Sequence, residues 1–155
     1  MNVYMVVKTV HVISATILFG TGIGIAFFKW IVDRSGDVAA IRVVSERVVI
    51  ADWIFTVPAI VVQMISGWHL AWTAGFSMTK GWLLCAIVLF FVAGSCWIPV
   101  VALQIRMRNV AQRAHDSEQP LPDQYRRDSR LWFWLGVPAF GSLIVIYWLM
   151  VAKPF

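Results

Sequence analysis

Long apolar stretches that alternate with shorter polar segments dominate the pattern of this chain. Four stretches reach the roughly 20 residues that a helix needs to cross a bilayer, and they lie at about 3–31, 49–73, 81–104 and 131–152. Glycine and proline are scattered inside them, which membrane helices tolerate better than soluble ones do. The strict alternation of apolar and polar residues that is typical of barrel strands is absent from the sequence. The pattern therefore predicts four transmembrane helices.

Helical periodicity continues beyond the apolar stretches at one end of the predicted bundle. Apolar residues from Val38 to Val48 recur at helical spacing ahead of the second span. The third span continues through 105–114, and 123–130 leads into the fourth. The sequence thus predicts an all-α membrane protein with a single domain over residues 1–155. Its fold is an antiparallel bundle of four transmembrane helices that extend into the cytoplasm.

Charge gives this bundle an orientation. Hydrophobic residues make up 60% of the chain and charged ones 14%, which is too apolar for a soluble domain of this size. Basic residues gather at two of the three connections between spans, and these are Lys29, Arg34, Arg42, Arg47, Arg106, Arg108, Arg113, Arg126, Arg127 and Arg130. The positive-inside rule places those connections in the cytoplasm and both termini in the periplasm of a bacterial inner membrane. The net charge of +5 follows from this asymmetry and does not indicate a nucleic-acid partner.

Tryptophans support the same topology, because their amphipathic rings prefer the two membrane interfaces. Trp30, Trp53, Trp132 and Trp134 fall at the predicted inner boundary, and Trp68, Trp72, Trp82 and Trp148 fall at the outer one. Trp97 is the exception, since it lies deeper in the third span.

Two histidines carry the candidate chemistry. His11 lies in the first span and His69 in the second, both in the predicted outer half of the bilayer. An ionisable residue at such a depth marks a functional site by default, and two imidazoles on facing helices are the usual ligands of a six-coordinate b-type haem. The alternative is that each histidine only packs and forms hydrogen bonds, with His69 an interfacial residue.

Neighbouring residues complete this predicted haem b site. The candidate metal ligands are His11 and His69, and the residues expected to surround the cofactor are Lys8, Ser14, Ser66 and Trp72. Lys8 lies one turn outward from His11, where its ammonium could meet a haem propionate or reach the headgroups. Gly20 and Gly24 form a GxxxG pair that admits either a flat macrocycle or another helix, which leaves a homodimer open.

Two further polar residues lie within the second span. Asp52, at the inner boundary, is expected to pair with a nearby arginine. Gln63 lies near the midplane. We expect it to link helices by hydrogen bonding, and a role as a proton relay is the less favoured alternative. Pro58, Pro99 and Pro138 are expected to kink their helices.

Short motifs resemble known membrane families. The opening from Lys8 through His11 to Gly22 resembles a bacterial family of small predicted integral membrane proteins of unassigned function. More distantly, the chain is similar to HemJ-type protoporphyrinogen oxidases and to the CopD copper-resistance membrane domain. The HemJ-type motifs are Lys-x-x-His, matched by Lys8 and His11, then Thr-x-Pro, matched by Thr56-Val-Pro58, and Gly-Trp-Leu, matched by Gly81-Trp82-Leu83.

The HemJ-type resemblance implies haem b ligation by His11. It also implies a functional lysine shortly after Gly-Trp-Leu, but this chain has Leu84-Cys85-Ala86 there. The leading hypothesis is therefore electron transfer by a b-type haem near the outer leaflet, with a quinone or a redox protein as partner. The alternatives are a porphyrinogen oxidase, a copper-handling module using Met5, Met64 or Met78, and a non-catalytic assembly subunit.

Overall fold

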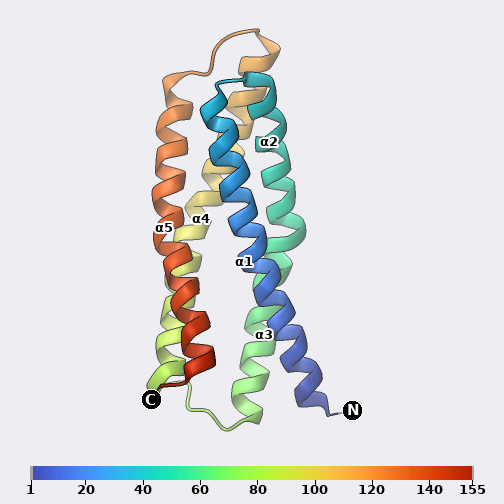
Figure 1. Ribbon diagram of the computed structural model, residues 1–155, viewed down its shortest axis with the longest axis vertical. Helices are drawn as coiled ribbons and strands as arrows, with labels where there is room; N and C mark the ends of the chain where they lie inside the picture. The colour runs from blue at the N-terminus through green and yellow to red at the C-terminus, as the bar shows by residue number, and fades with distance from the viewer. Residues whose placement is uncertain (1, 155) are drawn as a thin grey trace.

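The computed structural model describes residues 2–154 and consists of long helices (Figure 1). The elements are α1 (Val3–Ser35), α2 (Val38–Ala51), the π-helical turn η1 (Asp52–Thr56), α3 (Val57–Thr73), α4 (Gly81–Asp116) and α5 (Asp123–Ala152). Because α2, η1 and α3 follow one another without a break, the chain forms four rods. Within the described residues there is no strand.

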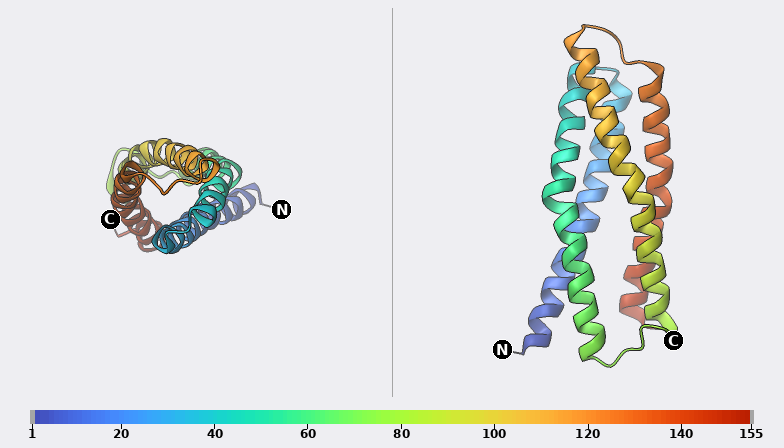
Figure 2. Two further views of the ribbon diagram at one scale, coloured as in Figure 1. Left: turned by 90° about the horizontal axis from the view of Figure 1, so that it is seen from above. Right: turned by 180° about the vertical axis from the view of Figure 1, so that it is seen from behind.

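The four rods run antiparallel to one another (Figures 1 and 2). Both termini and the connection at 74–80 lie at one end of the bundle, which we name the terminal end. The connections at 36–37 and 117–122 lie at the opposite end, which we name the arginine-rich end. The predicted all-α four-helix fold, with helices that continue beyond the apolar stretches, is confirmed.

Local sequence explains the sharp turn at the arginine-rich end. Gly36 adopts a left-handed conformation with φ of 72° and ends α1, a conformation that glycine adopts without a steric penalty. Asp37 then caps α2, because its side chain accepts hydrogen bonds from the backbone N–H groups of Ala39 and Ala40. Two residues are therefore enough to reverse the chain.

The second rod contains a π-helical turn that the sequence analysis did not predict. Val57 N–H donates to the Asp52 carbonyl, five residues earlier, rather than to the residue four earlier. Pro58 follows at once; it has no N–H to donate, and its ring clashes with the carbonyl four residues before it. At Pro58, where a kink was expected, the structure has a widened helical turn just before the proline. Such π-helical turns occur frequently at functional sites.

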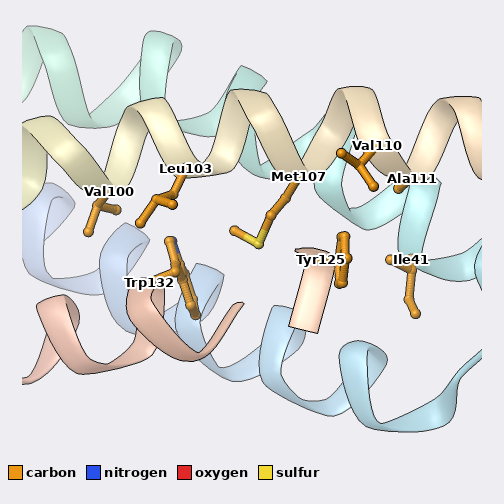
Figure 3. Packing of buried hydrophobic residues seen from close by; sticks show 8 residues of the cluster. All are labelled: Ile41, Val100, Leu103, Met107, Val110, Ala111, Tyr125 and Trp132. Carbon is orange, nitrogen blue, oxygen red and sulfur yellow. The ribbon is translucent and has the colours of Figure 1, made fainter. Parts of the chain in front are cut away.

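Two clusters of buried residues hold the rods together. The larger lies toward the arginine-rich end and comprises Ile41, Val100, Leu103, Met107, Val110, Ala111, Tyr125 and Trp132 (Figure 3). The smaller lies at the terminal end and comprises Ala71, Trp82, Leu83, Ala86 and Leu149. The stretch between them contains less buried side-chain packing and is where the candidate site lies.

The outside of the rods is apolar over much of their length. Large side chains such as Ile65, Phe91 and Ile98 are exposed, which would be unfavourable over so large an area in water. The four rods are long and apolar enough to cross a membrane. At 1.5 Å per residue, a helix of 30 residues such as α5 is about 45 Å long and exceeds the roughly 30 Å hydrocarbon core.

Candidate functional site

His11 is half-buried where α1 contacts α3. Its Nδ1 lies 2.8 Å from the Ser66 hydroxyl oxygen, and that hydroxyl donates its own proton to the Val62 carbonyl. Ser66 can therefore only accept from His11, which places the imidazole proton on Nδ1 and leaves the lone pair on Nε2. This is the arrangement in which a histidine is oriented for ligation, with its other nitrogen held by a hydrogen bond.

Close contact between the two helices supports this arrangement. A Cβ atom on Gly67 would lie 3.2 Å from His11 Cε1, so the imidazole occupies space that any other residue would fill. Gln63 Nε2 donates to the His11 carbonyl at 2.7 Å and to the Ser14 hydroxyl at 2.9 Å. The prediction that Gln63 links helices by hydrogen bonding is confirmed.

Among the described residues, no hydrogen bond joins His11 to the other predicted haem residues, Lys8, His69 and Trp72. Lys8 and His69 are exposed, and Trp72 is 75% exposed instead of forming a pocket wall. His69 lies about 110° round α3 from the centre of the face that Gln63, Ser66 and Gly67 turn to α1, at 100° per residue. The geometry therefore gives His11 as one candidate ligand of an iron and does not place His69 opposite it. Within residues 2–154 no group of three or more histidine, cysteine, aspartate or glutamate residues could hold a metal ion.

A second candidate site is a partly open cavity of about 440 Å³ lined by residues of all four rods. Its wall is mostly apolar and includes Leu18 from α1, Ile60 from α3, Phe90 from α4 and Leu143 from α5. Neither histidine of the predicted haem site lines it. A volume of this size is within the range of about 300–1,000 Å³ found for small-molecule sites.

Glycines create part of this space. Gly94 and Gly136 line the cavity from α4 and α5, and a Cβ atom on either would meet no atom within 4 Å. Gly22 differs, because a Cβ there would lie 2.7 Å from the Phe140 ring. Because Gly94 and Gly136 have no side chains, they leave open volume in the cavity. Because Gly22 has none, α1 and α5 can approach each other closely there.

Toward the arginine-rich end, the cavity lining includes polar side-chain atoms without a hydrogen-bond partner. Four of the five buried, unpaired side-chain polar atoms found in the described residues belong to its lining: Asp52 Oδ2, Gln104 Oε1, Trp97 Nε1 and Trp132 Nε1. Leaving such an atom unpaired costs about 1–3 kcal/mol. These four atoms are thus concentrated around one largely apolar cavity.

Asp52 does not pair with an arginine, so that prediction is wrong. Its Oδ1 accepts a hydrogen bond of 2.7 Å from the Thr56 hydroxyl, one turn away in η1. The ion pairs of the described residues join Lys29 to Asp33 and Arg106 to Asp128. Asp52 and Thr56 both line the cavity, and Asp52 is 5% exposed.

Sequence analysis missed a buried polar network beyond this end of the cavity. Lys29, assigned there only to the topogenic charges, is 1% exposed. Its ammonium donates to Asp33 at 2.8 Å and to the Tyr125 hydroxyl at 2.9 Å. The Tyr125 and Ser129 hydroxyls also donate to Asp33, at 2.6 and 2.7 Å. The i, i+4 spacing of Lys29 and Asp33 was the available signal.

The network is satisfied within itself and offers no free charge to the cavity. The Lys29 ammonium lies 5.6 Å from the centre of the Trp132 ring, which lines the cavity on its other side. Trp132 therefore contacts both the Lys29 network and the cavity. The sequence pattern did mark Asp52 and the unusual depth of Trp97, but it gave no sign that η1, α4 and α5 bring the polar residues of this lining together.

Two of the short motifs have structural roles in this chain. Gly81 has a positive φ of 67° at the start of α4, and Trp82 and Leu83 are buried in the terminal-end cluster. Thr56 bonds to Asp52, and Pro58 follows the π-helical turn. Packing and backbone geometry account for these residues without a porphyrinogen-oxidising activity.

A family described as "predicted integral membrane protein (DUF2269)" matches residues 5–154, and the chain belongs to it. No curated protein and no solved structure matches the chain. The resemblance to a membrane family without an assigned function is thus confirmed, whereas the more distant similarity to HemJ-type oxidases and CopD finds no support in these comparisons.

Proposed function

We propose that this integral membrane protein binds a membrane-soluble amphiphile in the cavity between its four helices. The observation that carries the proposal is the set of unpaired buried atoms on Asp52, Trp97, Gln104 and Trp132 around an otherwise apolar cavity. A ligand with a polar end and an apolar body satisfies both parts of such a site. Water could reach the polar atoms, but it would not fill the apolar remainder favourably.

The shape of the cavity supports an elongated ligand. Along α4 the lining extends from Phe90 to Gln104, which is about 21 Å at 1.5 Å per residue. Along α5 it extends from Trp132 to Leu143, or about 16 Å. The polar residues cluster toward one end of this length, and the other end is apolar, as in the binding site of a molecule that partitions into the bilayer.

Filling the cavity tests this function. Gly136→Leu would place a side chain in the open volume, because a Cβ there meets nothing within 4 Å. Gly141→Leu is the matched control on the same helix: residue 141 is exposed, also has room for a Cβ and does not line the cavity. Each protein is purified in mild detergent, checked for a single symmetric elution peak, extracted with organic solvent and analysed by mass spectrometry.

The wild type and Gly141→Leu are expected to retain the same small molecule at near-stoichiometric amounts, and Gly136→Leu at least 10-fold less of it. The contrary result would be that the extracts of all three proteins contain only bulk lipid, in equal amounts. That result would show that the cavity retains no ligand.

A second candidate function is electron transfer by a haem b, which the geometry of His11 favours. Its Nε2 lone pair is free because Ser66 accepts the Nδ1 proton. A b-type haem bound there would supply a one-electron couple, with a quinone or a partner protein as the exchange partner. His11 is the one axial ligand that this proposal names, since His69 lies away from that face of α3.

A reduced-minus-oxidised absorption spectrum of protein expressed with ample haem tests this candidate. The wild type and His69→Ala should show a b-type α-band, and His11→Ala should lose most of it. The exposed His69 serves as the matched control, because both variants remove an imidazole from the predicted outer half. A wild-type spectrum without an α-band would rule out the haem.

A further inference from the structure

We infer that the ligand of the cavity is a quinone or quinol, a neutral ring that carries oxygen atoms on opposite sides and an apolar tail. This inference rests on the proposed function and adds the chemical class of the ligand. It follows from the donors and acceptors in the lining, from the absence of a free cation among them, and from the shape of the surrounding wall.

A ligand that pairs with the unpaired atoms must supply both hydrogen-bond acceptors and donors. The indole N–H groups of Trp97 and Trp132 only donate, so their partner must accept. Gln104 Oε1 accepts, so a partner must donate to it. Asp52 already accepts from Thr56 and lies within hydrogen-bonding reach of the Gln104 side chain. Quinone carbonyls meet the first requirement, and quinol hydroxyls meet both.

Charge argues against anionic membrane amphiphiles. The residues that line the cavity include no lysine, arginine or histidine, and Asp52 is their one ionisable group. A phosphate or a fatty-acid carboxylate would therefore lie beside Asp52 with no counter-charge, because Lys29 is already paired with Asp33. Burying an unpaired charge in this way is strongly unfavourable.

An amine is a poorer fit for a different reason. An ammonium group would suit Asp52, but it has no lone pair to accept from Trp97 or Trp132. Both indole N–H groups would then stay buried without partners. The donors in the lining thus favour an uncharged oxygen-bearing ring over a cation.

The positions of the polar residues also suit a ring with oxygen atoms at opposite sides. Trp97 lies seven residues before Gln104 on α4, or about 10 Å along the helix. Side chains from these two levels can meet opposite edges of one ring. Phe90, Phe133 and Phe140 supply an aromatic wall, and the glycines at 94 and 136 leave it open. The volume suits the ring and the start of a tail, the rest of which would lie in lipid.

Thermal unfolding in detergent with added probes tests this inference. The probes are decylubiquinone and decylubiquinol, compared with decanoic acid, decylamine and decylphosphocholine at equal concentrations. A ligand that binds only the folded state raises the unfolding temperature. We expect both quinone forms to raise it for the wild type and for Gly141→Leu, with no effect on Gly136→Leu and none from the charged probes.

Removing one donor tests the recognition itself. Trp97→Phe keeps an aromatic ring but loses the indole N–H, and it should weaken decylubiquinone binding at least 10-fold. Trp134→Phe, at an exposed position of α5 outside the lining, should bind as the wild type does. Equal binding by both variants would overturn the assignment of Trp97.

The outcomes separate this inference from the proposed function. If a co-purified molecule depends on Gly136 but no quinone form binds, or if a charged probe binds instead, the ligand class is wrong and the cavity function stands. If no molecule co-purifies and no probe binds, both proposals fail.

Discussion

At the scale of single residues, burial decides what an ionisable side chain does in this chain. Lys8 and Lys29 lie on the same helix, yet Lys8 is exposed and Lys29 is 1% exposed. Lys29 is held by Asp33 and Tyr125 and lies against the Trp132 ring. His11 shows the same dependence, because Ser66 fixes its proton and Gly67 makes room for its ring.

The Lys29 network yields a prediction about stability. Lys29→Met removes the counter-charge of Asp33, whose side chain is 13% exposed, and removing one partner of a buried pair typically costs about 3 kcal/mol or more. The free energy of unfolding in mixed detergent micelles should fall by about that amount. Lys8→Met, on the same helix but exposed, should leave it nearly unchanged.

A double variant separates lost charge pairing from lost packing. Lys29→Met with Asp33→Asn removes both charges, so it should recover part of the stability that Lys29→Met loses. If the double variant is as unstable as Lys29→Met alone, an unpaired carboxylate is not the cause, and the packing of the lysine chain against Trp132 would account for the loss.

At the scale of elements, backbone irregularities place the polar side chains. The π-helical turn Asp52–Thr56 interrupts a rod that would otherwise run as one α-helix from Val38 to Thr73. The turn contains one additional residue, which rotates α2 relative to α3. Asp52 and Thr56 line the cavity, whereas Ser66 and Gln63 bond to α1. The second rod thereby serves two sites, one on each of two helix faces.

At the scale of the whole molecule, the rods are packed tightly at the two ends and less tightly between them. The larger buried cluster and the Lys29 network hold the arginine-rich end, and the smaller cluster holds the terminal end. The cavity lies between the clusters, where α1 and α5 meet through Phe140 against Gly22. A partly open, ligand-sized space thus lies between rods that are packed together on both sides of it.

The basic residues at one end predict the orientation of the whole molecule. All nine arginines lie near the two connections at the arginine-rich end, on the helix segments that lead into and out of them. By the positive-inside rule, this end of the bundle is expected to face the cytoplasm. Reporter fusions in a bacterial host check this prediction. Alkaline phosphatase, which is active only outside the cytoplasm, should be active when fused after residue 155 and inactive when fused at residue 119. The reverse pattern would show the opposite orientation.

Much of this protein follows from the sequence by itself. The four rods, their antiparallel order and their extension past the membrane follow from the lengths of the apolar stretches and the helical spacing beyond them, because the hydrophobic thickness of a bilayer fixes what can span it. The role of Gln63 in linking helices was also predictable, since a buried amide in lipid needs a partner.

Only the tertiary structure decided which polar groups meet. Periodicity gives the face of a helix but not the rotation of one rod against the next, and the π-helical turn changes that rotation within the second rod. His11 and His69 were predicted to share a space, but His69 lies about 110° round α3 from the face that meets α1. Asp52, Trp97, Gln104 and Trp132 line one cavity from three different rods. Depth in the membrane is encoded locally, whereas the pairing of side chains across a bundle depends on contacts between rods.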